Sequence, residues 1–369
     1  MAIKIDDIIK ALRTVRYPGT GQDIVSAGMV ENDMRIEGNK VSLSLVTEKV
    51  NDPFIKSVVK MAEQAVLTYV NEKIDIKGNI TVKSKQLPAP ESQAWLSGVK
   101  NIVAVASGKG GVGKSTVCTN LAVALALKGY KVGVLDADIF GPSIPKMLNV
   151  EESGADVQKI NGRDMIVPIE NYGIKMLSIG FFVNKQDAVI WRGAMASNAL
   201  KQLIADADWG ELDYFLIDFP PGTSDIHLTL VQSLAITGAV IVSTPQEVAL
   251  ADARKGISMF TADKVGVPIL GLVENMAWFT PEELPENKYY IFGKDGCKRL
   301  AEEKGYALLG QIPIVQSIRE GGDKGAPEAL QTESITGKAF AELAQNVVAA
   351  VKKRNEELPP TRIVNVTMR

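Results

Sequence analysis

Cysteine and histidine are nearly absent from this sequence. The 369 residues include two cysteines, Cys118 and Cys297, and one histidine, His227. So few cysteines predict no disulfide framework, and a reducing cytoplasmic compartment is the simplest expectation. One histidine excludes a His/Cys zinc pattern and a Ser-His-Asp hydrolase triad. We expect His227 to have a structural role.

Long apolar runs and a surplus of charge of one sign are also missing. No segment has the length and apolar character of a membrane span, and the first seven residues lack the apolar core of a secretory signal. The net charge of −2 at pH 7 argues against general affinity for nucleic acid, which requires concentrated positive charge. We therefore expect no membrane partner and no nucleic-acid partner.

A glycine-rich segment carries the strongest functional signal. Residues 108–116 read GKGGVGKST and fit the phosphate-binding pattern G-x-x-x-x-G-K-[ST]. An apolar strand over residues 101–106 precedes it and an Ala/Leu-rich helix over 117–128 follows, so the helix dipole would point at the phosphates. This context disfavours an ordinary glycine-rich turn. The predicted ATP-binding residues are Gly108, Lys109, Gly110, Gly111, Val112, Gly113, Lys114, Ser115 and Thr116, with Lys114 reaching the β- and γ-phosphates and Ser115 ligating Mg²⁺.

The length predicts two domains, and the pattern of elements changes along the chain. Residues 1–85 predict a small α/β domain, with helices at 8–15 and 53–70 and strands at 41–46 and 80–82. Residues 86–99 predict a linker and 357–369 a C-terminal tail. Residues 100–356 alternate short apolar strands with helices, which indicates an α/β fold with a mostly parallel, helix-flanked sheet. The further strands are expected at 132–135, 214–217, 239–243, 269–273 and 308–312, with a closing helix at 336–353.

Three aspartates follow two of these strands. In an open α/β sheet the ligand lies beyond the carboxyl ends of the strands, so these carboxylates are expected near the phosphates. We expect Asp218 to act as a Walker B carboxylate for Mg²⁺ and Asp136 to be a second carboxylate on the metal side. Asp138 is the candidate for orienting the attacking water. A helix N-cap is the alternative for any single aspartate, but the three together with the phosphate loop favour a nucleotide site.

These motifs resemble a known family of ATPases. Lys109, the extra lysine of the loop, is similar to that of the MinD/ParA/nitrogenase-reductase ATPases. Residues 136–143 (DADIFGPS), 218–225 (DFPPGTSD), 273–276 (VENM) and 310–313 (GQIP) resemble the Mrp (ApbC) iron–sulfur cluster carriers. The resemblance implies a P-loop NTPase that forms a homodimer, in which Lys109 contacts phosphate across the interface. It further implies that Asn275 reads the adenine edge and that the segment after Pro313 lines the base or ribose.

The N-terminal region extends the resemblance to nearly the whole chain. Residues 17–30 (YPGTGQDIVSAGMV) are similar to the small domain shared by iron–sulfur assembly factors and many Mrp proteins. The resemblance implies ATP hydrolysis with Lys109, Lys114 and Asp138 as catalytic residues. Apoprotein clients and iron–sulfur assembly factors would be the partners.

The cluster ligands of the family are missing. Most carriers have a C-x-x-C pair after the segment matching residues 275–279, and two subunits hold a [4Fe–4S] cluster; this chain reads TPEELPENK at 280–288. The cysteine often found in the N-terminal domain is absent from 47–53. Cys118 is expected to be a buried thiol of the loop helix. Cys297, near a turn and beside Lys298, is the better candidate ligand. Glu282, Glu283 and Glu286 could offer oxygen ligands, although an acidic loop is usually solvated.

Three classes of function follow from these observations. The first is an ATPase that transfers iron–sulfur clusters to apoproteins, or assists a carrier without holding the cluster. The second is a MinD/ParA-like switch ATPase that positions or assembles other molecules and carries no cluster. Against it, the tail does not read as a basic amphipathic helix and the charge does not suggest DNA binding. The third is a metabolite kinase, which Lys109 disfavours.

Overall fold

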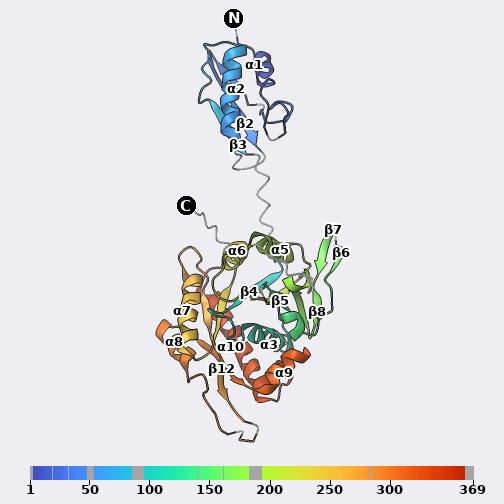
Figure 1. Cartoon of the computed structure of the whole chain (residues 1–369), viewed down its shortest axis with the longest axis vertical. Coiled ribbons are helices and arrows are strands. Elements are labelled where there is room, and N and C mark those ends of the chain that lie inside the picture. Colours follow the sequence, from blue (N-terminus) through green and yellow to red (C-terminus); the bar gives the residue numbers. More distant parts are fainter. Residues whose placement is uncertain are drawn as a thin grey trace. The chain divides into compact units, whose positions relative to one another are not determined.

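The computed structural model describes most of the chain in two compact units. It describes residues 3–18, 20–31, 33–47, 54–84, 95–139, 141–160, 162–182, 193–281, 283–284 and 286–361. The units are Met1–Gln93 and Ala94–Arg369 (Figure 1). Most of the predicted linker, the tail from residue 362 and the candidate ligand Glu282 lie outside the described residues.

The first unit is a small α/β domain. Helices α1 (Ile5–Leu12) and α2 (Ile55–Tyr69) share one apolar core with a three-stranded sheet of order β1-β2-β3. Strand β2 (Lys40–Thr47) pairs antiparallel with β1 (Arg35–Glu37) and parallel with β3 (Ile80–Ser84). The two predicted helices and two predicted strands are confirmed. The three-residue β1 was not predicted, because so short an edge strand has no periodicity to detect.

The second unit contains an eight-stranded sheet. Its order is β13-β12-β11-β4-β10-β5-β9-β8, and all neighbouring pairs are parallel except β8 with β9. The predicted mostly parallel sheet is confirmed. The strands are β4 (Val99–Ala106), β5 (Val132–Asp136), β8 (Ile169–Asn171), β9 (Ile174–Ser178), β10 (Leu212–Asp218), β11 (Gly238–Ser243), β12 (Ile269–Phe279) and β13 (Leu308–Ile314).

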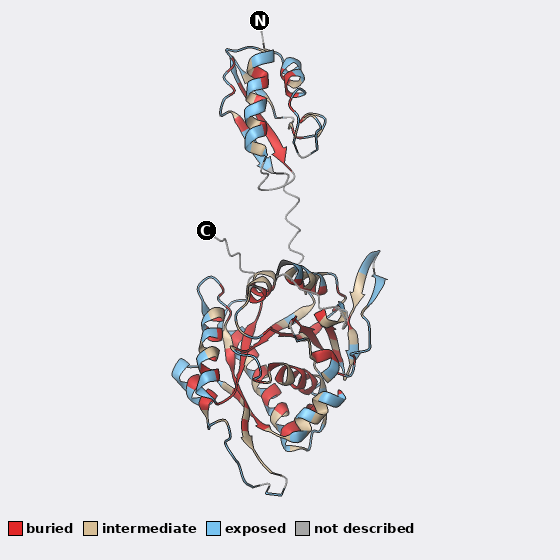
Figure 2. Cartoon of the chain, viewed as in Figure 1, coloured by how far each residue is buried: buried red, intermediate tan, exposed pale blue. Residues whose placement is uncertain are grey.

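Helices cover both faces of this sheet, and the buried residues concentrate along it (Figure 2). Along β4, Val103 and Val105 join the core with α3 and α10, whereas Ile102 and Ala104 join the core with α5, α6, α7 and α8. Burial on both faces explains why the strands read as continuous apolar runs. The helices are α3 (Lys114–Leu127), α4 (Ile144–Met147), α5 (Gly193–Ala205), α6 (Asp225–Ser233), α7 (Glu247–Thr261), α8 (Gly296–Lys304), α9 (Gln316–Lys324) and α10 (Ile335–Glu357).

Smaller elements complete the second unit. Strands β6 (Asp156–Ile160) and β7 (Arg163–Val167) form a separate hairpin, and two short 3₁₀ helices cover Ile179–Phe182 and Glu328–Leu330. Among the described residues, no helix combines the length and apolarity needed to cross a membrane.

The strand register places two of the predicted carboxylates, Asp136 and Asp218, side by side in the sheet. Strand β10 lies between β4 and β5, and Asp218 pairs with Val105 on one side and Asp136 on the other. Both aspartates therefore end neighbouring parallel strands at the carboxyl edge of the sheet. The same edge is where β4 leads into the glycine-rich segment.

Candidate nucleotide-binding site

Residues 107–113 form a loop between β4 and the first turn of α3. Gly113 has φ of 80° at the N-cap of α3, a left-handed conformation that favours glycine. A Cβ atom on Gly113 would collide with the side-chain amide of Asn275, and one on Gly108 would collide with the backbone carbonyl of Asp252 in α7. Neighbouring elements therefore press against the loop backbone at Gly108 and Gly113. Its position directs the positive end of the α3 dipole into the loop.

Lys114 and Ser115 converge on Asp218. The Lys114 Nζ atom donates to Asp218 Oδ1 at 2.7 Å, and the Ser115 hydroxyl donates to Asp218 Oδ2 at 2.6 Å. Lys114 Nζ also lies 3.8 Å from Asp138 Oδ2. Lys114 is 5% exposed and Asp218 is 0% exposed, so this is a buried charge pair. Loop, strand and helix thus bring three predicted site residues into direct contact.

Asp136 and Asp138 have different surroundings. Asp136 accepts hydrogen bonds from the backbone N–H groups of Asp138 and Ile144, at 3.2 and 3.3 Å, and from the Ser178 hydroxyl at 3.0 Å. Its carboxylate thus holds the segment between β5 and α4. Asp138 Oδ1, in contrast, is buried and has no hydrogen-bond partner among the described residues. Asp138 therefore presents an unused acceptor beside Lys114.

Burial shifts the pKa values of the two strand-end carboxyls in the same direction. Burial, and next the charge of Asp218, raise the pKa of Asp136 to about 8. Burial also raises the pKa of Asp218, and the charge of Lys114 opposes that shift. Asp138 and Asp218 both lie against the single lysine Lys114, so the site lacks positive charge. A cation bound there would offset the deficit.

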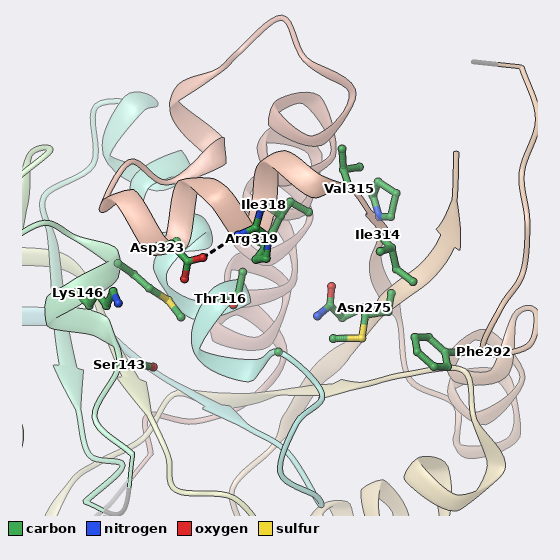
Figure 3. Close-up of a pocket in the computed structure, with 15 residues that line it drawn as sticks. Thr116, Ser143, Lys146, Asn275, Phe292, Ile314, Val315, Ile318, Arg319 and Asp323 are labelled. Atoms are coloured by element: carbon green, nitrogen blue, oxygen red, sulfur yellow. Dashed lines mark hydrogen bonds and ion pairs between the residues drawn. The ribbon is translucent and has the colours of Figure 1, made fainter. Parts of the chain in front are cut away.

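Two adjoining cavities open beside the loop. One, of about 250 Å³, is lined by loop residues with Asp138, Ser143 and Pro221. The other, of about 620 Å³, shares Gly113, Thr116, Ser143 and Met147 with the first. Figure 3 shows the larger cavity between α9 on one side and Asn275 and Phe292 on the other. Its walls are mainly apolar, and Arg319 and Asp323 form an ion pair of 3.0 Å at its rim.

A bulge in β12 presents Asn275 to the larger cavity. The pairing of β12 with β13 shifts between Asn275 and Phe279, and Met276 has a φ of 56°. Non-glycine residues seldom adopt this conformation, and such strain concentrates at functional sites. The Asn275 Nδ2 atom donates to the Val112 carbonyl at 2.8 Å. Because a carbonyl can only accept, the amide oxygen of Asn275 is directed away from the loop.

Some residues that line the larger cavity were predicted from the sequence and others were not. The segment after Pro313 and residue Asn275 do line the larger cavity. Met147, Lys146 and Met276 line it as well but were not predicted, since α4 is four residues long and nothing in the sequence indicates the β12 bulge. Lys109 is exposed and lines the smaller cavity.

Neither thiol reaches the surface. Cys297 and Cys118 are both 0% exposed, and burial raises the pKa of each thiol. Cys297 lies in the first turn of α8, and its backbone N–H donates to the buried Glu274 carboxylate at 2.6 Å. In this conformation Cys297 therefore does not present a thiolate to a second subunit. Within the described part of the chain, no group of three or more Cys, His, Asp or Glu side chains is arranged to hold a metal ion.

His227 packs inside the second unit. It is 0% exposed and its Nδ1 accepts from the Ser224 backbone N–H at 3.1 Å, at the start of α6. Burial lowers the pKa of His227 to about 4, so its ring is neutral at pH 7. These contacts agree with the structural role expected for it.

Sequence comparison identifies the family. The model described as NUBPL iron-transfer P-loop NTPase matches residues 98–348, about two thirds of the chain. The chain belongs to this family. A second model, described as iron–sulfur cluster assembly protein, matches residues 5–76 in the first unit. Both matches confirm the resemblance noted from the motifs.

Relatives of this family match along most of their length. An iron–sulfur cluster carrier protein of Synechocystis is 43% identical over 348 residues, covering 94% of this chain and 97% of the relative. An iron–sulfur protein required for NADH dehydrogenase in Arabidopsis thaliana mitochondria is 51% identical over 263 residues, covering 71% and 82%. Among solved structures, a nucleotide-binding protein of Archaeoglobus fulgidus in complex with ADP is 37% identical, with a TM-score of 0.57, and the match covers 67% of this chain and 94% of that one.

Proposed function

We propose that this chain binds ATP with Mg²⁺, hydrolyses it as a homodimer, and uses the ATP cycle to pass iron–sulfur clusters to apoproteins or to assist their delivery. The observation that carries the proposal is the contact of Lys114 and Ser115 with Asp218 beside two adjoining cavities. The smaller cavity has the lining expected for phosphates and the larger has the apolar walls expected for a base.

Ser115, which lines the smaller cavity, and the buried Asp218 that it contacts fit Mg²⁺. Ser115 and Asp218 supply oxygen atoms, which are the ligands that Mg²⁺ prefers, and the buried carboxyls leave positive charge in deficit. We propose that Ser115 and Asp218 hold the ion, and that Asp136 supports it from behind by fixing the segment before α4. When bound, Mg²⁺ neutralises charge on the β- and γ-phosphates.

Lys114, Asp138 and Lys109 would supply the remaining contacts with the phosphates and the attacking water. Lys114 would leave Asp218 and contact the β- and γ-phosphates. Asp138, with its unpartnered oxygen beside Lys114, would accept a hydrogen bond from the attacking water and orient it. Lys109, exposed at the cavity mouth, is available to reach phosphate bound by a second subunit.

The adenine base is assigned to the larger cavity. With its nitrogen donating to Val112, Asn275 can offer its oxygen to the 6-amino group of adenine. Guanine carries an oxygen at this position and would leave the acceptor unpaired. Apolar side chains such as Ile318 and Phe292 suit the faces of the ring (Figure 3).

The cluster is the cargo in this proposal, and buried thiols favour transient holding or assistance over a bridging thiolate site. The relatives named as iron–sulfur cluster carriers support the cargo assignment. Glu283 and Glu286 remain candidate oxygen ligands on the segment that replaces C-x-x-C.

Two measurements test the proposal separately. Phosphate release from ATP should require Mg²⁺ and should not require an added phosphate acceptor; a strict acceptor requirement would indicate a kinase. Anaerobic reconstitution with iron and sulfide, followed by absorption spectra and metal analysis, should compare the wild type with Cys297→Ser. Equal iron content in both proteins is expected, whereas a stable cluster lost in Cys297→Ser would establish the thiol as a ligand. A wild type that neither holds a cluster nor speeds transfer from a loaded donor to an apoprotein would remove the cargo assignment.

A further inference from the structure

A third cavity lies at the opposite edge of the large sheet from the nucleotide site. It has a volume of about 420 Å³ and lies where β4 and β11 begin, next to the C-terminal end of α10. Ile102 of β4 lines the cavity, and the phosphate loop begins five residues further along the strand, roughly 17 Å away at about 3.3 Å per residue. Its apolar wall consists of Trp95, Leu96, Ile102, Ala235, Leu358 and Pro360.

A buried arginine forms part of the wall. Arg354, in the last turn of α10, is 8% exposed and lines the cavity. Its guanidinium donates to three neutral acceptors: Asn355 Oδ1 at 3.1 Å, the Pro359 carbonyl at 2.8 Å and Thr361 Oγ1 at 3.2 Å. A guanidinium has five N–H groups, and the buried Nε atom has no acceptor among the described residues.

Among the residues that the structure describes, no carboxylate balances the charge of Arg354. No described carboxylate forms an ion pair with it, and burial lowers its pKa without an opposing acidic neighbour. The other cation of the wall, Lys100, is paired with Asp213 at 2.8 Å. None of the described residues that line the cavity is acidic. Buried charges are ordinarily paired, because an unpaired one loses its hydration without compensation.

A purely structural role explains only part of this arrangement. Two contacts of Arg354 fasten residues 359–361 to the end of α10, and the negative end of the helix dipole favours a cation there. Neither contact explains a cavity beside the guanidinium that is large enough for a small molecule. An uncharged donor, such as glutamine, could fasten the same backbone at a lower cost of burial.

We propose that this cavity binds a ligand that joins one carboxylate to an apolar body, with the carboxylate paired to Arg354 and the body packed against Trp95 and Leu358. The second N–H of Nη1, which the contact with Asn355 leaves unused, can donate to the carboxylate. Two sources offer this chemistry: a free organic acid, or the C-terminal carboxylate of a peptide. The site differs from the nucleotide site in both location and charge.

Calorimetric titration of the full chain with matched probes tests the proposal. Hexanoate is compared with hexanamide, and N-acetyl-Gly-Leu is compared with its C-terminal amide. At least one acid should bind at least about tenfold more tightly than its amide, because the amide lacks the charge that pairs with Arg354. Binding of hexanoate alone would identify a free acid as the source, and binding of N-acetyl-Gly-Leu alone would identify a peptide terminus. Equal binding of each acid and its amide, or no saturable binding, would overturn the proposal.

Two variants locate the binding. Arg354→Lys keeps the positive charge but replaces the planar guanidinium group with an ammonium group. This variant should weaken acid binding about tenfold. Ala235→Phe leaves Arg354 intact and fills the cavity, so it should abolish binding even if Arg354→Lys proves unstable. Arg254→Lys, at an exposed arginine paired with Glu303, is the matched control and should bind as the wild type does. ATP turnover should be unchanged in Ala235→Phe and Arg254→Lys. Wild-type acid affinity in Ala235→Phe would place the binding elsewhere and refute the site.

Discussion

The Nζ atom of Lys114 lies 2.7 Å from Oδ1 of Asp218, so the phosphate-loop lysine is paired with the carboxylate that ends the neighbouring strand. Ser115 donates to the other oxygen of the same carboxylate. Both groups that would contact the nucleotide and its metal ion are therefore held by one buried side chain. Binding of a nucleotide with Mg²⁺ would replace these contacts.

Lys114→Ala should abolish ATP turnover. Removing the lysine deletes the positive charge at the phosphates, and losing a comparable electrostatic contact typically lowers kcat by about 10²- to 10³-fold. It also leaves Asp218 buried without its partner, so the free energy of unfolding should fall by about 3 kcal/mol. Phosphate release and chemical denaturation measure the two effects. Lys338→Ala, at an exposed lysine paired with Glu333, is the control and should change neither. Unchanged hydrolysis in Lys114→Ala would refute the assigned site.

Asp138→Ala should bind ATP but hydrolyse it slowly. The unpartnered Oδ1 atom is the acceptor proposed for the attacking water, and its loss should lower kcat about 10²-fold with little change in the Kd for ATP. Single-turnover kinetics and equilibrium binding of a non-hydrolysable ATP analogue separate the two. A normal kcat would reassign the water-orienting role to another group.

Asn275→Ala should weaken both binding and base selection. The variant loses the hydrogen bond to the Val112 carbonyl and the acceptor proposed for adenine. The Kd for ATP should rise about fivefold, since one hydrogen bond is worth on the order of 1 kcal/mol. The preference for ATP over GTP should narrow in parallel. Competition binding with ATP and GTP separates the role of the Val112 hydrogen bond from that of the adenine acceptor. Loss of the Val112 hydrogen bond alone would leave the preference for ATP over GTP unchanged.

The free energy of unfolding of the nucleotide-free protein should fall between pH 6.5 and 8. Because the pKa of Asp136 is raised to about 8, its folded form keeps a proton that the unfolded chain releases near pH 3.8. The folded state then binds more protons, so its stability decreases as the pH rises toward 8. The lowered pKa of His227 acts oppositely, but only between about pH 4 and 6.5.

One extra proton gives a slope of about 1.4 kcal/mol per pH unit, or roughly 2 kcal/mol over this range. Denaturant titrations at closely spaced pH values measure it. Asp136→Asn removes the titrating group and should flatten the profile, whatever its effect on absolute stability. An equally steep profile in that variant would assign the slope to Asp218.

Both thiols should resist modification in the folded protein. Cys118 and Cys297 are fully buried, and burial raises their pKa values, so little thiolate is available to react. Reaction with Ellman's reagent should be at least about a hundredfold slower than in the unfolded chain, where two thiols per chain should react. A fast thiol in the native protein that disappears in Cys297→Ser would show that Cys297 reaches the surface and is available to a cluster.

The local sequence pattern was sufficient to predict most strands of the large sheet. The apolar runs that became β4, β5, β10, β11, β12 and β13 are each bounded by turns or helices, and both of their faces are buried, so composition alone reveals them. The edge region from β6 to β9 was not predicted. Strands β6, β7 and β8 are short and have no buried residues, and β9, although buried, is only five residues long. The bulge that turns Asn275 and Met276 into the larger cavity was also missed, because it depends on pairing with β13.

The sequence by itself determined that residues 108–116 carry the phosphate-binding pattern, that acidic residues follow the neighbouring strands, and that the C-x-x-C pair is missing. These are properties of residue type and spacing, which local backbone chemistry fixes. Only the tertiary structure decided that Lys114 pairs with Asp218 rather than Asp136, that Cys297 is enclosed by the core, and that Arg354 lies buried beside a cavity with no acidic partner among the described residues. Those outcomes depend on strand register and on helix packing between residues far apart in the chain, which no local pattern encodes.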